Sequence, residues 1–252
     1  MQNKLSKKNI IEIKKLDEYF KYPFNNKLLS KKLDSEINKL IDIKFKKKIK
    51  LYILSGSTIG NISEQIKLFS ANYGIQIEIK ESGYNQYYEE ALFGNEIKKF
   101  NPDWIYIHTN IKNINYFSYN IDTEKKSDKF CNDNVNKIKK ILSSLKKYRK
   151  KIIINNFEFP DLKVNNVFNN TNDLGIINSI RKLNSKIINT ISNNNNIYLN
   201  DVNYLSNIIG INEWIDKNYW AAFKIAFSSK AFPYLSSSIS SIIASVEGLS
   251  KK

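Results

Sequence analysis

Ser57 is the first residue in the chain whose type and position suit covalent chemistry. It closes the tripeptide Ser55-Gly56-Ser57, which follows the apolar run IKLYIL at 49–54. A serine in a tight turn between a strand and a helix lies near backbone N–H groups, a geometry that suits a nucleophile beside an oxyanion site. Serine is also a preferred helix N-cap, and from the neighbouring residues alone this structural role is the simpler interpretation. No GxGxxG or Walker A sequence occurs here, so the turn lacks the phosphate cradle of dinucleotide-binding and P-loop proteins.

His108 is the one histidine of the chain, and therefore the only imidazole available as a general base. It ends the apolar segment DWIYIH at 103–108, and Asn110 follows two residues later. We expect this segment to lie near the strand that precedes Ser57, which makes a Ser57–His108 pair geometrically possible. The alternative is a partly buried histidine at a strand end. A serine–histidine pair also needs a third group that orients the base, and spacing alone assigns no acid near His108.

A third candidate site surrounds Asp216. This residue follows Trp214 and precedes Tyr219-Trp220, and Lys224 comes four residues after Trp220. An aspartate between tryptophans, on a loop before the last helix, is typical of a binding site. The alternative is an aromatic anchor that holds the C-terminal helix.

Five short apolar segments alternate with helical patterns along most of the chain. The expected strands cover 49–54, 75–79, 103–108, 151–155 and 196–200, and the expected helices cover 62–73, 87–100, 135–148, 176–191, 202–208 and 229–246. Such alternation predicts an α/β fold, a three-layer, doubly wound, parallel five-stranded sheet with helices on both faces. Functional residues of such folds collect at the carboxyl ends of the strands. Those ends are Ser55–Ser57, Glu81–Gly83, His108–Asn110, Asn155–Asn156 and Asn200–Asp201.

Composition excludes several classes of protein. The 252 residues include 40 Lys+Arg and 24 Asp+Glu, a net charge of +16, yet Arg149 and Arg181 are the only arginines. Nucleic-acid binding is disfavoured, because base and phosphate recognition usually relies on arginine. One cysteine and one histidine exclude a disulfide framework and a Cys/His metal site, so we expect no metal and no cofactor. No segment is long and apolar enough for a membrane span or a secretory signal, which predicts a cytoplasmic protein without membrane contact.

The first 48 residues form an expected N-terminal helical extension to an α/β domain at 49–252. Two amphipathic patterns, from Ile10 to Phe20 and from Leu28 to Ile41, flank a break at Pro23. The segment up to Lys50 is rich in lysine, which indicates a solvated cationic face.

Several segments together resemble a known family. IKLYILSGSTIGNI, ESGYNQYYEEAL, FNPDWIYIHTN, IIINNFEFP, IYLNDVNYLSNIIGINEWIDKNYW and FKIAFS stand in the order and spacing of the N-terminal domain of FkbH-like proteins, which belong to subfamily IIIC of the HAD superfamily. The resemblance covers about residues 48–252 and implies an SGNH-hydrolase-like fold. It also implies a role in loading glyceryl groups onto acyl carrier protein, in polyketide or surface-polysaccharide biosynthesis. The chain ends where the family's HAD domain begins, as expected of a truncated, split or degenerate copy.

The resemblance also implies site residues. Ser57 matches the nucleophile of the SGNH Gly-Asp-Ser block, Gly83 the oxyanion-donor glycine and Asn110 the oxyanion-donor asparagine. Asp216 matches the acid of the last Asp-x-x-His block, but Tyr219 stands where the histidine is expected. Without that base the serine is a weak nucleophile.

Two functions therefore stay open. The first is a non-hydrolytic or weakly active domain that docks an acidic acyl carrier protein or a HAD-domain partner. The second is an active serine esterase or acyl hydrolase, with Ser57 as nucleophile, His108 as a displaced base, and Gly83 and Asn110 as oxyanion donors. Asp216 is the third candidate catalytic residue, as the acid that the resemblance implies. Candidate substrate-binding residues for either function are Gly83, Asn110, Asn156, Trp220 and Lys224.

Overall fold

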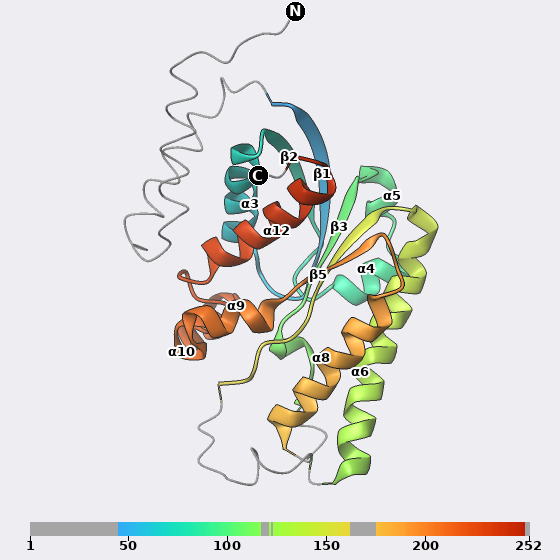
Figure 1. The fold of residues 1–252 in the computed structure, drawn as a ribbon, viewed down its shortest axis with the longest axis vertical. Helices are drawn as coiled ribbons and strands as arrows, with labels where there is room; N and C mark the ends of the chain where they lie inside the picture. The colour runs from blue at the N-terminus through green and yellow to red at the C-terminus, as the bar shows by residue number, and fades with distance from the viewer. Residues whose placement is uncertain (1–44, 117–120, 122, 162–174, 250–252) are drawn as a thin grey trace, which may run out of the picture. The chain divides into compact units, whose positions relative to one another are not determined.

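The computed structural model describes residues 45–116, 121, 123–161 and 175–249 (Figure 1). The two amphipathic helices expected before residue 45 lie outside the described residues. The described chain forms two compact units. The larger comprises Lys50–Thr58 and Ile79–Ser228, and the smaller includes Ile59–Glu78 and the C-terminal segment from Ser229.

The expected five strands are present and form one sheet. They are β1 (Lys47–Ser55), β2 (Ile75–Glu81), β3 (Trp104–His108), β4 (Lys151–Asn155) and β5 (Ile197–Asn200). Their order is β2-β1-β3-β4-β5, that of flavodoxin-like doubly wound proteins. The pairs β1–β3, β3–β4 and β4–β5 are parallel, with Ser55 opposite His108 and Asn155 opposite Asn200. The predicted parallel α/β sheet is confirmed, and the carboxyl ends of β1 and β3 bring Ser57 and His108 together.

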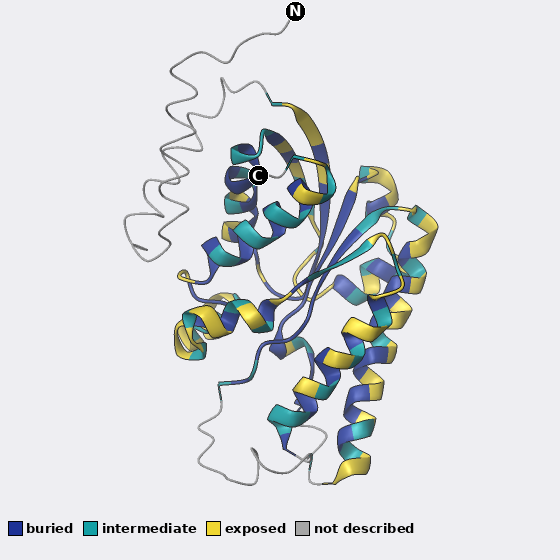
Figure 2. Cartoon of the chain, viewed as in Figure 1, coloured by how far each residue is buried: buried dark blue, intermediate teal, exposed yellow. Residues whose placement is uncertain are grey.

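The central strands are buried because helices of the larger unit cover their apolar side chains. Figure 2 shows β3 and β4 almost wholly buried. Helices α6 (Glu124–Leu145) and α8 (Ile176–Ile191) lie side by side, and α4 (Tyr87–Phe93) packs against α6 (Figure 1). Their inward side chains form one core with alternate residues of the strands. Examples are Leu54, Ile107 and Ile154.

In the smaller unit, helix α3 (Gly60–Asn72) packs against α12 (Phe232–Val246). Small hydroxyl side chains let the two helices approach closely. Ser70 Oγ donates to Ser240 Oγ at 3.0 Å, and Ser240 Oγ donates to the carbonyl of Ile66 at 3.2 Å. These bonds satisfy hydroxyl groups that would otherwise be costly to bury.

Three local predictions are wrong in their bounds. Helix α6 begins at Glu124 rather than at the expected residue 135, because the Thr123 side chain caps it by accepting from the Lys126 N–H. The predicted helix 87–100 is divided into α4 and α5 (Glu96–Phe100), with Gly94 ending the first. The segment around Asp216, expected to be a loop, holds the short helices α10 (Ile211–Trp214) and α11 (Lys217–Phe223), which follow α9 (Val202–Ile209).

Candidate functional site

The turn after β1 needs a glycine at position 56. The Gly56 N–H donates to the carbonyl oxygen of His108 at 2.8 Å, so the turn lies directly against the end of β3. A Cβ atom at this position would lie 2.7 Å from that oxygen and 2.5 Å from Asn113 Oδ1. Only glycine allows so close an approach, and the approach places Ser57 beside His108.

Ser57 and His108 form a hydrogen-bonded pair. Ser57 Oγ lies 3.0 Å from His108 Nε2, and both residues are 0% exposed. The N-cap of α3 is Ile59, which makes no side-chain cap bond, so the interpretation of Ser57 as a helix cap is wrong. The pair that strand adjacency made possible is present, with the geometry of a nucleophile and its base.

The third group beside His108 is a tyrosine rather than a carboxylate. Tyr106 Oη lies 2.9 Å from His108 Nδ1 and donates to Asn155 Oδ1 at 3.1 Å. The Asn155 amide is itself fixed, since its Nδ2 donates to the Thr109 carbonyl and its Oδ1 accepts from Asn200 Nδ2, both at 2.8 Å. A continuous buried chain of hydrogen bonds therefore runs from Ser57 across three strands to Asn200.

Burial sets the protonation of this chain. It lowers the pKa of His108 to about 3, because the charged imidazolium is poorly solvated there. The ring of Phe227 packs edge-on against the imidazole at 5.6 Å between centroids, and Trp214 packs against Phe227 at 5.1 Å. His108 is therefore neutral at pH 7, as a general base must be.

Asn110 and Glu158 bring further polar atoms to the ends of β3 and β4. Asn110 is fully buried, its Oδ1 accepts from the Lys112 N–H, and its Nδ2 has no hydrogen-bond partner among the described residues. Glu158 Oε1 accepts from the Ile111 N–H at 3.1 Å, while no residue in the described part of the chain bonds its buried Oε2. Burial raises the pKa of Glu158 to about 7. Asn110 Nδ2 is thus a buried donor that the described residues leave unused, two residues after His108.

Gly83 lies in an exposed loop near the same turn. Its neighbour Ser82 accepts the Ser55 N–H through Oγ at 2.8 Å, and Asn113 Nδ2 joins Gly56 O to Asn85 Oδ1. The loop is therefore tied to the turn that carries Ser57.

Asn156 is buried, and its amide is engaged elsewhere. Its Nδ2 donates to Asp201 Oδ1 at 2.7 Å, and its Oδ1 accepts from the Asn203 N–H at 3.0 Å. These bonds connect β4 to the start of α9.

Asp216 caps a helix. Its Oδ1 accepts from the N–H groups of Asn218 and Tyr219 at 2.9 and 3.1 Å, which begins α11. The partner of His108 Nδ1 is Tyr106, so the structure does not pair Asp216 with the base. Helix α11 instead presents Trp220, whose ring lies 5.7 Å from Lys224 Nζ and 5.9 Å from Lys112 Nζ. The Lys224 carbonyl accepts the Thr58 N–H at 3.0 Å, which joins this cationic group to the residue after Ser57.

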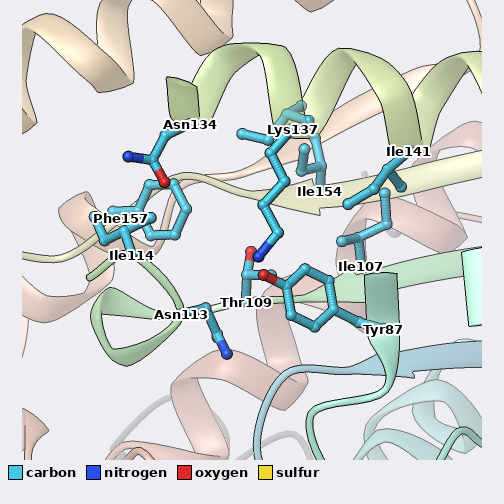
Figure 3. Close-up of a pocket in the computed structure, with 11 residues that line it drawn as sticks. Tyr87, Ile107, Thr109, Asn113, Ile114, Asn134, Lys137, Ile141, Ile154 and Phe157 are labelled. Carbon is cyan, nitrogen blue, oxygen red and sulfur yellow. The ribbon is translucent and has the colours of Figure 1, made fainter. Parts of the chain in front are cut away.

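A cavity of about 20 Å³ lies on the face of β3 that meets α6 (Figure 3). Ile107 and Thr109 line it, and they alternate along the strand with Tyr106 and His108, which point to the opposite face. The side chain of Lys137 extends from α6 toward Thr109 beside the ring of Tyr87 (Figure 3). The cavity holds about one water molecule and is therefore too small for a substrate.

The described residues hold no cluster of three or more His, Cys, Asp or Glu side chains that could bind a metal ion. Within the same part of the chain, no helix has the length and apolar character needed to cross a bilayer.

Sequence reasoning missed Tyr106, Asn155 and Glu158. A signal for Tyr106 was available, because a residue two before His108 on a strand shares its face. Asn155 was noted only as a strand end, and its contact with Tyr106 depends on the pairing of β3 with β4.

Comparisons with known proteins give the family. A family model described as FkbH, N-terminal domain, matches residues 50–244. No curated protein sequence matches the chain significantly. The N-terminal part of a Bacteroides fragilis protein that contains a phosphatase domain, solved with Mg, has a TM-score of 0.71 at 18% identity, over 87% of this chain and 56% of that one. The chain therefore spans just over half of that structure, and at this identity the likeness shows the fold alone.

Two further solved structures are similar at a lower level. An acetyl xylan esterase has a TM-score of 0.49 at 15% identity, over 77% of this chain and 100% of its own. A salicylyl-acyltransferase from a tetracycline biosynthetic pathway has a TM-score of 0.48 at 10% identity, over 79% of this chain and 54% of its own. These two likenesses are too weak to support an inference about activity. The family match runs over most of the chain and agrees with the observed sheet, so the protein belongs to the FkbH N-terminal domain family, with its SGNH-like α/β fold.

Proposed function

We propose that this domain is a slow acyl-handling centre of the FkbH type, in which Ser57 accepts an acyl or glyceryl group from an ester or thioester on acyl carrier protein. The observation that carries the proposal is the 3.0 Å contact between Ser57 Oγ and His108 Nε2. A neutral imidazole at this distance can remove the hydroxyl proton during attack.

The step follows from these atoms. Ser57 Oγ attacks the carbonyl carbon, its proton passes to His108 Nε2, and the carbonyl π pair moves to oxygen. Asn110 Nδ2 is the donor that stabilises this oxyanion. The carbon–sulfur or carbon–oxygen bond then breaks, and the leaving group takes the proton from Nε2. Water or an acceptor hydroxyl releases the acyl group by the reverse sequence.

Two features of the site make this centre slow. The group beside Nδ1 is a neutral tyrosine, which stabilises an imidazolium less than a carboxylate does. The lowered pKa of His108 also makes it a weak base. Slow turnover agrees with the weakly active domain that the sequence favours over an efficient esterase.

The remaining candidate residues belong to substrate binding in this proposal. Trp220, with Lys112 and Lys224 near its ring, offers an aromatic and cationic surface close to Thr58. Gly83 contributes through the loop tied to Ser55. Asn156 and Asp216 act by holding the loops around α9 and α11.

A fluorophosphonate probe tests the proposal, since it phosphonylates only an activated serine. We expect intact-mass spectrometry to show one slow adduct on the wild type, mapped to Ser57 by peptide analysis. Ser57→Ala should give none, and His108→Asn should label at least about tenfold more slowly. Ser55→Ala, which removes the neighbouring buried hydroxyl, is the matched control and should label normally. Equal labelling of wild type and Ser57→Ala refutes the proposal.

Charge favours a second candidate function, docking of an acidic carrier protein without acyl transfer. The solvent side of α6 and the turn after it carries exposed lysines at 125, 129, 139, 140, 146 and 147. Complementary charge raises association rates and weakens with salt. A pull-down of acidic acyl carrier proteins at low and high salt tests this function. Binding that Lys139→Glu/Lys140→Glu abolishes, with no labelling of Ser57, would favour docking alone.

A further inference from the structure

We propose that Tyr106 is the positioning residue of this centre: it holds His108 as the tautomer protonated on Nδ1 and is itself held by Asn155. The inference rests on the proposed acyl-handling function, because positioning matters only if His108 serves as a base. Tyr106 touches no reacting atom and acts through the imidazole.

The hydrogen-bond chain decides the tautomer. A tyrosine hydroxyl has one hydrogen, and Tyr106 donates it to Asn155 Oδ1 at 3.1 Å. Its oxygen must then accept at the 2.9 Å contact with His108, which requires a hydrogen on Nδ1. In the opposite tautomer, Nδ1 has no hydrogen and must accept the hydrogen bond from the Tyr106 hydroxyl. It would leave the Tyr106 and Asn155 oxygen atoms facing each other at 3.1 Å with no hydrogen between them.

The orientation of Asn155 supports this assignment independently. Its Nδ2 donates to the Thr109 carbonyl at 2.8 Å, which leaves Oδ1 as the atom that faces Tyr106. Asn200 Nδ2 also donates to that oxygen. If the Asn155 amide were reversed, its Nδ2 would face Asn200 Nδ2 and its Oδ1 would face the Thr109 carbonyl oxygen. Burial raises the pKa of Tyr106, so the hydroxyl remains protonated and available to donate.

The consequence lies at Nε2. With the hydrogen on Nδ1, Nε2 carries a lone pair aimed at Ser57 Oγ, 3.0 Å away, and can take its proton. Without Tyr106 Oη, the buried Nδ1–H would lose its acceptor, and the Nε2–H tautomer, which donates to Ser57, becomes the better one. That tautomer cannot serve as the base. The tyrosine thus orients the histidine as the acid of a catalytic triad does, but it carries no negative charge to stabilise the imidazolium.

The tautomer can be observed directly, because His108 is the one histidine of the chain. Long-range proton–nitrogen NMR of protein labelled with ¹⁵N-histidine gives one pair of ring signals. We expect a protonated Nδ1 and an unprotonated Nε2 in the wild type at neutral pH. Tyr106→Phe should move the population toward protonated Nε2 and slow Ser57 labelling about tenfold, the size of one lost hydrogen bond. Tyr52→Phe, the same deletion at a buried position on neighbouring β1, should change neither.

Each outcome separates the two proposals. A wild type protonated on Nε2 overturns the inference, and this measurement holds even if Tyr106→Phe fails to fold. Unchanged ring signals in a folded Tyr106→Phe also overturn it. If the signals shift as expected but the wild type shows no Ser57 labelling, the positioning contact is supported and the proposed function fails.

Discussion

Glu158 gives the sharpest prediction about stability, because its carboxyl group is fully buried and its pKa is raised from 4.5 to about 7. Well below pH 4.5 the carboxyl is protonated in both the folded and the unfolded chain. As the pH rises from 4.5 to about 7, the unfolded chain releases this proton and the folded chain keeps it. The free energy of unfolding therefore falls over that window, and the fall stops above about pH 7.

The size of the effect follows from the shift. One pKa unit corresponds to about 1.4 kcal/mol, so a shift from 4.5 to about 7 costs about 3 kcal/mol once both states are ionised. Glu158→Gln removes the titration and keeps an Oε1 atom that can accept from the Ile111 N–H. Relative to wild type, we expect Glu158→Gln to gain about 3 kcal/mol between about pH 4 and pH 8.

Urea unfolding at a series of pH values, followed by circular dichroism, measures this difference. The comparison with wild type is needed because the titration of His108 changes the pH dependence of stability in the opposite direction. Its lowered pKa makes stability fall as the pH drops from 6.5 toward 3, and this contribution is common to both proteins. Glu96→Gln is the control of opposite sign, since Lys80 and Lys99 lower the pKa of the partly exposed Glu96 to about 2. A difference between wild type and Glu158→Gln that stays constant across the pH series would refute the reasoning.

Three further predictions concern the site and its supports. Ser57 labelling, expressed as its second-order rate constant, should stay level down to about pH 4, because the pKa of His108 is about 3 rather than 6.5; a fall centred near pH 6.5 would contradict this. Gly56→Ala should lower the free energy of unfolding by about 2 kcal/mol through its contact with the His108 carbonyl, while Gly60→Ala, whose Cβ meets nothing within 4 Å, should stay within about 0.5 kcal/mol. Asn184→Ala removes the side chain that bonds both the N–H and the carbonyl of Phe157, and should cost about 2 kcal/mol in urea unfolding.

Much of the fold could be predicted from local pattern. Each buried strand is an apolar run bounded by turn residues, such as KIIIN before Asn156, and each of these runs became a strand. Helix limits were less predictable where polar residues dominate. The first turns of α6 hold Glu124, Lys125 and Lys126, which have no apolar periodicity, and the Thr123 cap defines the start.

Some features of the candidate site could likewise be predicted from the sequence, and others depend on the folded chain. Residue type and position alone establish that Ser57 follows a strand, that His108 is the one available imidazole, and that no histidine follows Asp216. Residue types and their spacing along the chain are sufficient for these three predictions. The folded chain was needed to establish that β3 lies beside β1, that Gly56 lets the two strand ends touch, and that Tyr106 and Asn155 complete the chain of hydrogen bonds. Hydrogen bonds across neighbouring strands depend on strand order and register, which no single segment encodes, and burial then fixed the protonation of His108.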